Sequence, residues 1–232
     1  MSPVQRGSTP RAYDAHDIRH QLLQFDSQRL LHKNAPWQGT RYAIVFFNKD
    51  VNYRDDPRDK RSVKLQRAPP QPLTHLPTRR TPDVLAARHR LVTLLDRTRF
   101  PEDRSAAARP HSKYGTKRGT FISFGVSQSR KPRATRRAQG LYTRRAMNRN
   151  NTLYGEVYKA LVAYMEAFAP QTFGTHAKAR YQTCIVAKDS QCEWHRDTGN
   201  IGNGAITGLG AYKGGALWVE REGVLADIKN IE

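Results

Sequence analysis

Cysteines, acidic residues and long apolar runs are scarce in this sequence, and each shortage excludes a class of protein. Two cysteines among 232 residues cannot build a disulfide scaffold. No stretch approaches the run of about eighteen apolar residues that a membrane-spanning helix requires. The opening residues, MSPVQRGSTPRAYD, lack the apolar core of a signal peptide. These absences favour an intracellular protein in a reducing compartment, with no membrane partner.

The shortage of acidic residues leaves a large positive charge. The chain carries 40 Lys and Arg against 20 Asp and Glu, a formal net charge of +20, with a pI of about 10.5. Such a charge favours a polyanionic partner, most simply nucleic acid, without separating DNA from RNA. We therefore expect nucleic acid as a partner, and a nuclear location is compatible with this basicity.

The excess charge is concentrated in the middle of the chain. Residues 1–53 have a net charge of +3, residues 54–149 of +18, and residues 150–232 of −1. The middle is proline-rich at RAPPQPLTHLPTRRTP and holds the basic run SRKPRATRRAQGLYTRRAMNRNN. Segments of this kind are typically extended or disordered, and they also suit non-specific phosphate contacts. We expect two folded ends joined by a basic, partly disordered middle segment.

Two helices and a set of short strands are expected. Thr81 as a cap and Pro82 at the first helical position predict a helix near 82–97, inside the basic middle. An apolar stripe at helical spacing between Tyr154 and Phe168 predicts a second helix. Short strand-like runs broken by glycine follow it. This order predicts an α+β fold with flanking helices, and it is how a double-stranded β-helix (jelly-roll) begins.

One of these runs, QCEWHRDTGN, places His195 and Asp197 two residues apart. A kinase catalytic loop also contains His-Arg-Asp, but it requires an Asn where this chain has Gly202. On a strand, residues i and i+2 face the same side, so the two side chains would point at one position. With one more histidine they make the two-histidine, one-carboxylate set that leaves open positions on ferrous iron. A zinc pair with Cys192, or a surface histidine beside a solvated aspartate, are the alternatives.

The C-terminal part resembles the first half of the catalytic core of Fe(II)/2-oxoglutarate-dependent dioxygenases, in the branch related to thymine- and methylcytosine-oxidising enzymes. The shared pattern is a strand, His-x-Asp, a following Asn, an apolar strand ending in Gly, and a Gly-Gly-x-Leu turn. Here its residues are His195, Asp197, Asn200, Leu209-Gly210 and Gly214-Gly215-Ala216-Leu217. The resemblance implies a jelly-roll that binds Fe(II) and uses 2-oxoglutarate and dioxygen to hydroxylate a C–H bond.

The family's remaining site residues are expected at the other end of the chain. The family needs a second histidine as third iron ligand, followed by an arginine whose planar fork binds the distal carboxylate of 2-oxoglutarate. No histidine follows Asp197, but FDSQRLLHKNAPWQGTRYAIVFF resembles the closing half of the same fold. The resemblance thus makes His32 the third iron ligand and Arg41 the 2-oxoglutarate ligand. Considered singly, His32 is also compatible with an ordinary histidine in a loop. Arg41 is likewise compatible with a surface charge at the edge of a strand.

The two halves of the resemblance run in exchanged order. LADIKN at 225–230 and AHDIRH at 15–20 are alike. The end of the chain and its beginning therefore correspond to about the same point of the family fold. Either one unit cut from a tandem array or a circular permutant fits this order. We expect an oxygenase acting on a nucleic-acid base. The alternatives are a basic nucleic-acid-binding protein with an incomplete, inactive dioxygenase fold, and a truncated product without a stable fold.

Overall fold

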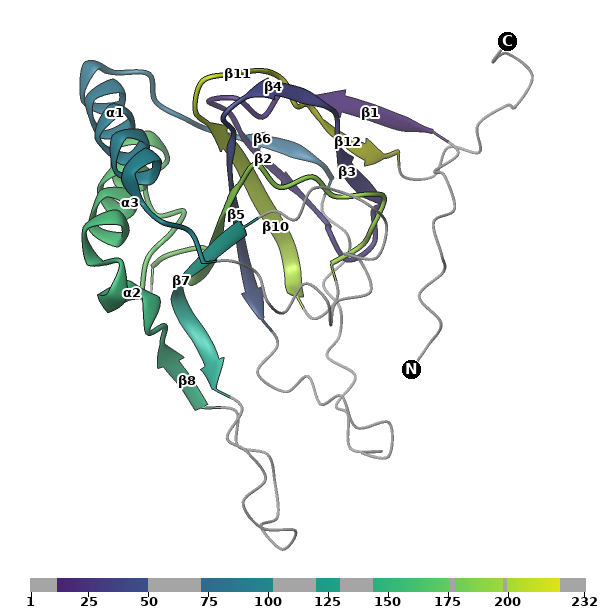
Figure 1. Cartoon of the computed structure of the whole chain (residues 1–232). Helices are drawn as coiled ribbons and strands as arrows, with labels where there is room; N and C mark the ends of the chain where they lie inside the picture. The colour runs from purple at the N-terminus through teal and green to yellow at the C-terminus, as the bar shows by residue number, and fades with distance from the viewer. Residues whose placement is uncertain are drawn as a thin grey trace, which may run out of the picture.

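The computed structural model describes residues 12–49, 72–101, 120–129, 144–175, 178–197 and 200–221. These residues form mostly antiparallel strands with a few helices, which confirms the predicted α+β class. The helices lie on one side of the strands, and a smaller group of strands lies on the other (Figure 1).

A seven-stranded sheet forms the centre of the molecule. In spatial order its strands are β6 (Thr74–Leu76), β2 (Leu22–Phe25), β10 (Asn200–Leu209), β5 (Tyr42–Lys49), β9 (Thr183–Lys188), β7 (Thr120–Ser129) and β8 (Arg144–Met147). Strand β10 lies between two strands from the other end of the chain, since Ile206 pairs with Leu23 on one side and with Val45 on the other.

Two smaller sheets hold the remaining described strands. In the first, β12 (Leu217–Glu220) lies between β1 (Tyr13–His16) and β3 (His32–Asn34), and in the second β11 (Tyr212–Gly214) pairs with β4 (Trp37–Gly39). Leu217 and Val219 of β12 share a buried apolar cluster with Leu23 and Ile206 of the large sheet. The sheet of β1, β12 and β3 therefore packs face to face with the large sheet, with alternate residues of β12 pointing between them.

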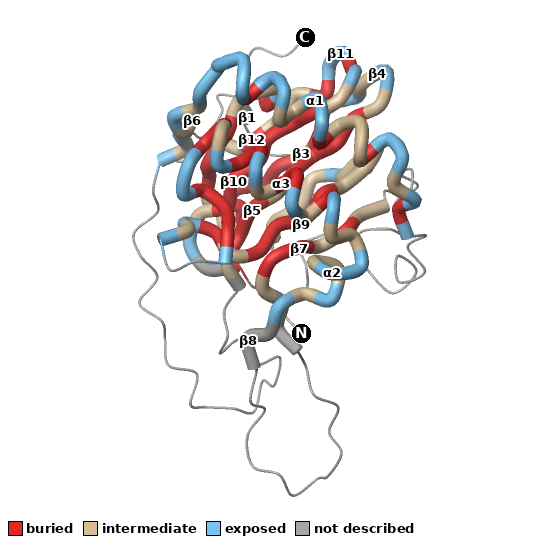
Figure 2. Tube along the Cα trace, turned by 90° about the vertical axis from the view of Figure 1, so that its left-hand side faces the viewer, coloured by how far each residue is buried: buried red, intermediate tan, exposed pale blue. Residues whose placement is uncertain are grey.

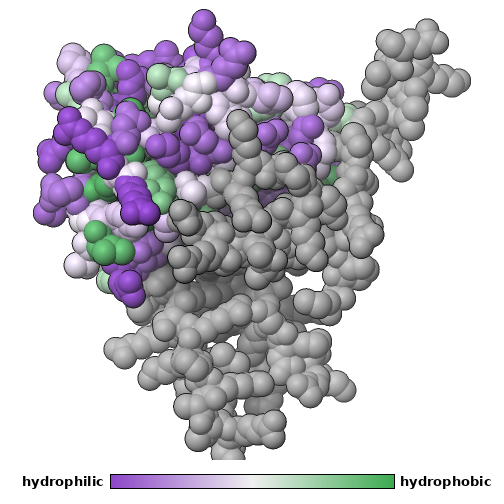
Figure 3. All heavy atoms as spheres, viewed as in Figure 1, coloured by the Kyte–Doolittle hydropathy of each residue, from purple (hydrophilic) through white to green (hydrophobic). Residues whose placement is uncertain are grey.

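The helices cover the outer face of the large sheet. They are α1 (Pro82–Arg97), α2 (Asn150–Leu153) and α3 (Gly155–Phe168). The Thr81 hydroxyl accepts a hydrogen bond from the Val84 N–H at 3.4 Å, which caps α1 as its sequence predicts. Buried residues run along the strands, and the solvent side of the helices is exposed and largely hydrophilic (Figures 2 and 3). None of the helices in the described ranges is long and apolar enough to cross a membrane.

The middle of the chain contributes to this core. Strands β6, β7 and β8 and helix α1 all belong to residues 54–149, and β7 pairs with β9 along Thr120–Gly125. This segment therefore supplies sheet strands as well as a connection between the two ends. Most of the basic run expected to be disordered, residues 130–143, lies outside the described residues.

Candidate metal centre

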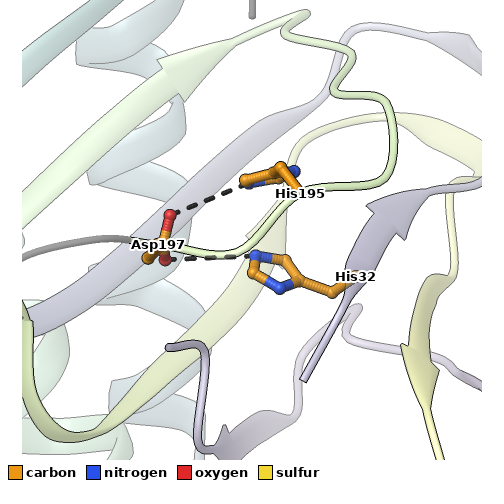
Figure 4. Close-up of side chains that lie close together, drawn as sticks. All are labelled: His32, His195 and Asp197. Atoms are coloured by element: carbon orange, nitrogen blue, oxygen red, sulfur yellow. Dashed lines mark ion pairs between the residues drawn. The ribbon is translucent and has the colours of Figure 1, made fainter. Parts of the chain in front are cut away.

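Three predicted ligand residues from opposite ends of the chain come together at one point (Figure 4). His32 begins β3, and His195 and Asp197 lie in the connection between β9 and β10. One ligand atom of each lies within 4.8 Å of those of the other two. The Asp197 carboxylate oxygens are 3.9 Å from His32 Nε2 and 3.7 Å from His195 Nε2.

The segment that carries His195 differs from the strand expected from its sequence. Strand β9 ends at Lys188, and His195 forms only an isolated bridge with His32. In that bridge the N–H of His32 donates to the His195 carbonyl at 3.0 Å, and the N–H of His195 donates back at 3.1 Å. The Asp197 N–H donates to the Ser27 carbonyl at 2.8 Å. Pairing with neighbouring segments thus holds the two ligands in place, without a regular strand of their own.

Backbone carbonyls orient both imidazoles. The Nδ1 atom of His32 lies 3.0 Å from the Leu30 carbonyl oxygen, and the Nδ1 atom of His195 lies 2.7 Å from that of Glu193. A proton on each Nδ1 leaves the Nε2 lone pair directed at Asp197, which is the usual orientation of metal-binding histidines. Burial, reinforced by the neighbouring His195, lowers the pKa of His32 to about 4. The imidazole is therefore neutral near pH 7, as metal binding requires.

The cluster fits a metal ion in spacing and in chemistry. Ligand bonds of about 2 Å at right angles put neighbouring ligand atoms about 3 Å apart, so both His–Asp pairs are within about 1 Å of that spacing. Two imidazole nitrogens and one carboxylate oxygen are the donor set of non-haem ferrous iron. Elsewhere in the described residues no group of three His, Cys, Asp or Glu side chains is close enough to share an ion, and Cys192 is not part of this one.

Arg41 is buried beside the centre with part of its hydrogen-bonding capacity unused. It precedes β5 and is 1% exposed. Its Nη2 donates to Asn34 Oδ1 at 3.1 Å, whereas Nε and Nη1 have no partner among the described residues. Burial lowers the pKa of Arg41, but an arginine stays protonated in proteins. A buried cation with unpaired donors is costly, and a bound anion would offset that cost.

Aromatic rings and a glycine shape the space around this guanidinium. Its central carbon lies 5.1 Å from the Trp37 ring centroid and 5.8 Å from that of Tyr212. Gly215 has φ +72°, and a Cβ there would lie 3.2 Å from Cδ and Nε of Arg41. Glycine at this position of the Gly-Gly-x-Leu turn therefore gives the arginine side chain its room.

Two residues near Arg41 were not predicted from the sequence. Asn34, the hydrogen-bond partner of Arg41, follows His32 by two positions and lies on the same face of β3, about 7 Å along the strand. The alternation of side chains along a strand was therefore a signal in the sequence that pointed to Asn34. Tyr212 was not marked by any pattern, yet its buried hydroxyl lies beside the Arg41 guanidinium.

Comparison with protein families, curated proteins and solved structures finds no match for this chain. The assignment of a function therefore depends on the geometry of the site and on the motifs that led to it. The four predicted site residues divide into a ligand cluster, His32, His195 and Asp197, and one buried cation, Arg41. Strand β3 connects the two, because it carries both His32 and the partner of Arg41.

Proposed function

We propose that the protein is an Fe(II)/2-oxoglutarate-dependent oxygenase that hydroxylates a C–H bond on a nucleic-acid base. The observation that carries the proposal is the convergence of His32, from one end of the chain, with His195 and Asp197 from the other. The sequence motifs alone indicate the same three residues. Two packed sheets with this cluster on their inner side support a jelly-roll core of the dioxygenase kind.

Each residue of the site has a distinct role in this proposal. His32, His195 and Asp197 hold Fe(II), and the Leu30 and Glu193 carbonyls keep the two imidazoles oriented. Bound ferrous iron, together with 2-oxoglutarate and dioxygen, supplies a decarboxylation of the co-substrate coupled to hydroxylation of the substrate.

Arg41 binds the distal carboxylate of 2-oxoglutarate in this scheme. Its unpaired Nε and Nη1 groups are the donors, and Asn34 holds the guanidinium from the other side. The spacing of about 7 Å along β3 between His32 and Asn34 suits a five-carbon dicarboxylate with one end at the metal. Tyr212 adds a buried hydroxyl donor next to the same guanidinium.

The net charge of +20 supports nucleic acid as the substrate class. A base in a duplex must be extruded before an enzyme can oxidise it, at a cost of a few kcal/mol, and a single-stranded base avoids most of that cost. The same charge also suits the alternative, a nucleic-acid-binding protein whose dioxygenase fold is inactive. Metal binding separates the two.

The decisive experiment measures metal binding by anaerobic calorimetry with Fe(II). The native chain should bind one equivalent. Asp197→Asn should abolish binding, because it removes the only carboxylate of the cluster. Glu193→Gln is the matched control, since it makes the same chemical change on an exposed side chain two residues before His195, and it should bind normally.

A second measurement tests the chemistry. Native protein with Fe(II), dioxygen and 2-oxoglutarate should release succinate, and Asp197→Asn should not. A folded native chain that binds no metal, or an Asp197→Asn variant that binds it as well as the native chain, contradicts the oxygenase. If nucleic acid still binds in that case, the inactive binding protein is the correct description.

A further inference from the structure

Three aromatic rings lie side by side on the outer face of the smaller sheet. Trp218 comes from β12, Tyr13 from β1, and Trp194 from the segment that carries the metal ligands. The Tyr13 ring centroid is 5.2 Å from that of Trp218 and 5.6 Å from that of Trp194, and the two tryptophans are 6.3 Å apart. Trp218 and Tyr13 are stacked at 27°, and the two tryptophans at 30°. Tyr13 and Trp194 are tilted at 55°, so the three rings form one contiguous aromatic cluster.

Lys33 adds a positive charge to this aromatic cluster. Lys33 and Trp218 are paired residues on neighbouring strands. The Lys33 ammonium lies 4.5 Å from the Trp218 ring centroid and 5.1 Å from that of Trp194. Cation–π contact holds the ammonium against the rings while its protons stay available to an anion. We call Tyr13, Lys33, Trp194 and Trp218 the aromatic platform.

The platform is accessible to solvent. Tyr13 is 45% exposed, and both tryptophans and Lys33 are partly exposed. Their strand neighbours, Leu217 and Val219 of β12 and His32 of β3, are buried on the opposite face. Aromatic side chains on neighbouring strands stabilise many sheets, and here a third ring, Trp194, and the Lys33 ammonium join the rings of the two strands.

We propose that the aromatic platform binds single-stranded nucleic acid by stacking its bases, with Lys33 contacting a phosphate. Every base has a π face, so stacking on aromatic side chains suits a strand of any sequence. Lys33 at the rings, together with the net charge of +20 of the whole chain, favours a polyanion over neutral ligands with flat rings. The inference rests on the nucleic-acid substrate of the proposed function, and it specifies a single strand.

The platform adjoins the metal centre. Trp194 and His195 are consecutive, and in the extended segment that pairs with β3 their side chains point to opposite faces. A strand stacked on the platform is therefore about one sheet thickness, roughly 10 Å, from the metal ligands. A base in a single strand needs no extrusion from a duplex before it can be oxidised.

Fluorescence anisotropy with labelled oligothymidylate of about 12 nucleotides tests the platform. The full chain is used with a chelator and about 0.3 M salt, which weakens general phosphate contacts. Trp218→Leu and Trp194→Leu should each lower the affinity on the order of tenfold, because leucine keeps apolar volume but not a stacking face. Trp218→Phe should retain most of the affinity.

Lysine variants separate the platform charge from general basicity. Lys33→Ala should weaken binding and reduce the slope of log affinity against log salt by about 1. The matched control is Lys213→Ala, an exposed lysine on β11 in a different sheet, which should change neither. A cooperative thermal transition in each variant shows that it is folded.

Three results would contradict this proposal. They are an unchanged affinity in Trp218→Leu, an equal loss of affinity for duplex and single strand in that variant, or binding of a proline-rich peptide in place of the oligonucleotide. Its failure is distinguishable from failure of the oxygenase. Asp197→Asn should bind oligothymidylate like the native chain, and Trp218→Leu should still bind one equivalent of metal. Loss of one property without the other identifies which proposal is wrong.

Discussion

Replacing Arg41 with methionine should remove co-substrate binding while leaving the stability of the ligand-free protein nearly unchanged. Methionine keeps a flexible apolar stem and removes the guanidinium. Among the described residues that group donates from Nη2 to Asn34 Oδ1, and its Nε and Nη1 have no partner there. An arginine with a purely structural role would be expected to have its donors satisfied.

The magnitude follows from these contacts. The hydrogen bond from the charged donor contributes about 1.5–3 kcal/mol, and the contacts with the Trp37 and Tyr212 rings about 1 kcal/mol each. Against this, each of two unsatisfied buried donors costs about 1–3 kcal/mol, and the variant lacks both. The two sides nearly cancel. We expect the unfolding free energy of ligand-free Arg41→Met to lie within about 2 kcal/mol of the native value.

The response to 2-oxoglutarate should differ strongly. At a ligand concentration a hundredfold above the dissociation constant, the native protein gains about 2.7 kcal/mol. For a chain of 232 residues this is a rise in Tm of about 5–10 °C. Thermal denaturation with saturating Mn(II), which binds like Fe(II) without supporting turnover, measures it. Arg41→Met should show no rise, and Arg41→Lys a smaller one, because lysine keeps the charge but not the planar fork.

Two outcomes would refute this reasoning. A loss of 3–5 kcal/mol in ligand-free Arg41→Met would mean that the guanidinium has structural partners beyond Asn34. An undiminished rise with 2-oxoglutarate would mean that its distal carboxylate binds elsewhere. Arg90→Met, at an exposed position of α1, is the control and should leave both measurements unchanged.

Two further predictions concern the framework around the site. The Tyr42 hydroxyl donates a 2.6 Å hydrogen bond to Asp96, which joins β5 to α1. Tyr42→Phe removes this bond, so urea denaturation should show a free energy of unfolding lower by about 1–2 kcal/mol, with metal binding unchanged. Burial and the nearby His75 lower the pKa of His16 below its ordinary 6.5, with Asp14 acting in the opposite direction. The unfolded chain then binds a proton that the folded chain does not, so this stability is complete above pH 6.5 and falls as the pH drops below it. His16→Gln should make denaturation midpoints less dependent on pH from about 7 to about 5, and an unchanged dependence would contradict this.

Local signals in the sequence predicted the helices well, whereas the pairing of strands far apart in the chain was harder to predict. A cap at Thr81 and a proline at Pro82 act within one turn, so the start of α1 could be read directly. Strand β7 lies among basic and proline-rich neighbours, and its place in the sheet depends on pairing with β9. Such pairing is a tertiary contact, which composition and propensity do not encode.

The same distinction applies to the site. The spacing of His195 and Asp197 was visible, but the extended conformation that aligns them comes from hydrogen bonds to His32 and Ser27 rather than from a strand of their own. The role of Tyr212 was invisible because it depends on where β11 places a hydroxyl relative to Arg41. Residue types thus indicated the chemistry, whereas the order of the strands determined which of them meet.

That order explains why neither end of the chain can form the centre alone. Strand β10 lies between β2 and β5, and β12 lies between β1 and β3, so in both sheets a strand from one end is flanked by strands from the other. Separating the ends would leave β2, β5, β1 and β3 without their shared neighbours and would part His32 from Asp197. Assembly of the sheets and assembly of the ligand cluster are therefore one event. A metal ion bound to all three ligands should stabilise the entire pairing of the two ends, because the ion binds the folded chain and not the separated halves.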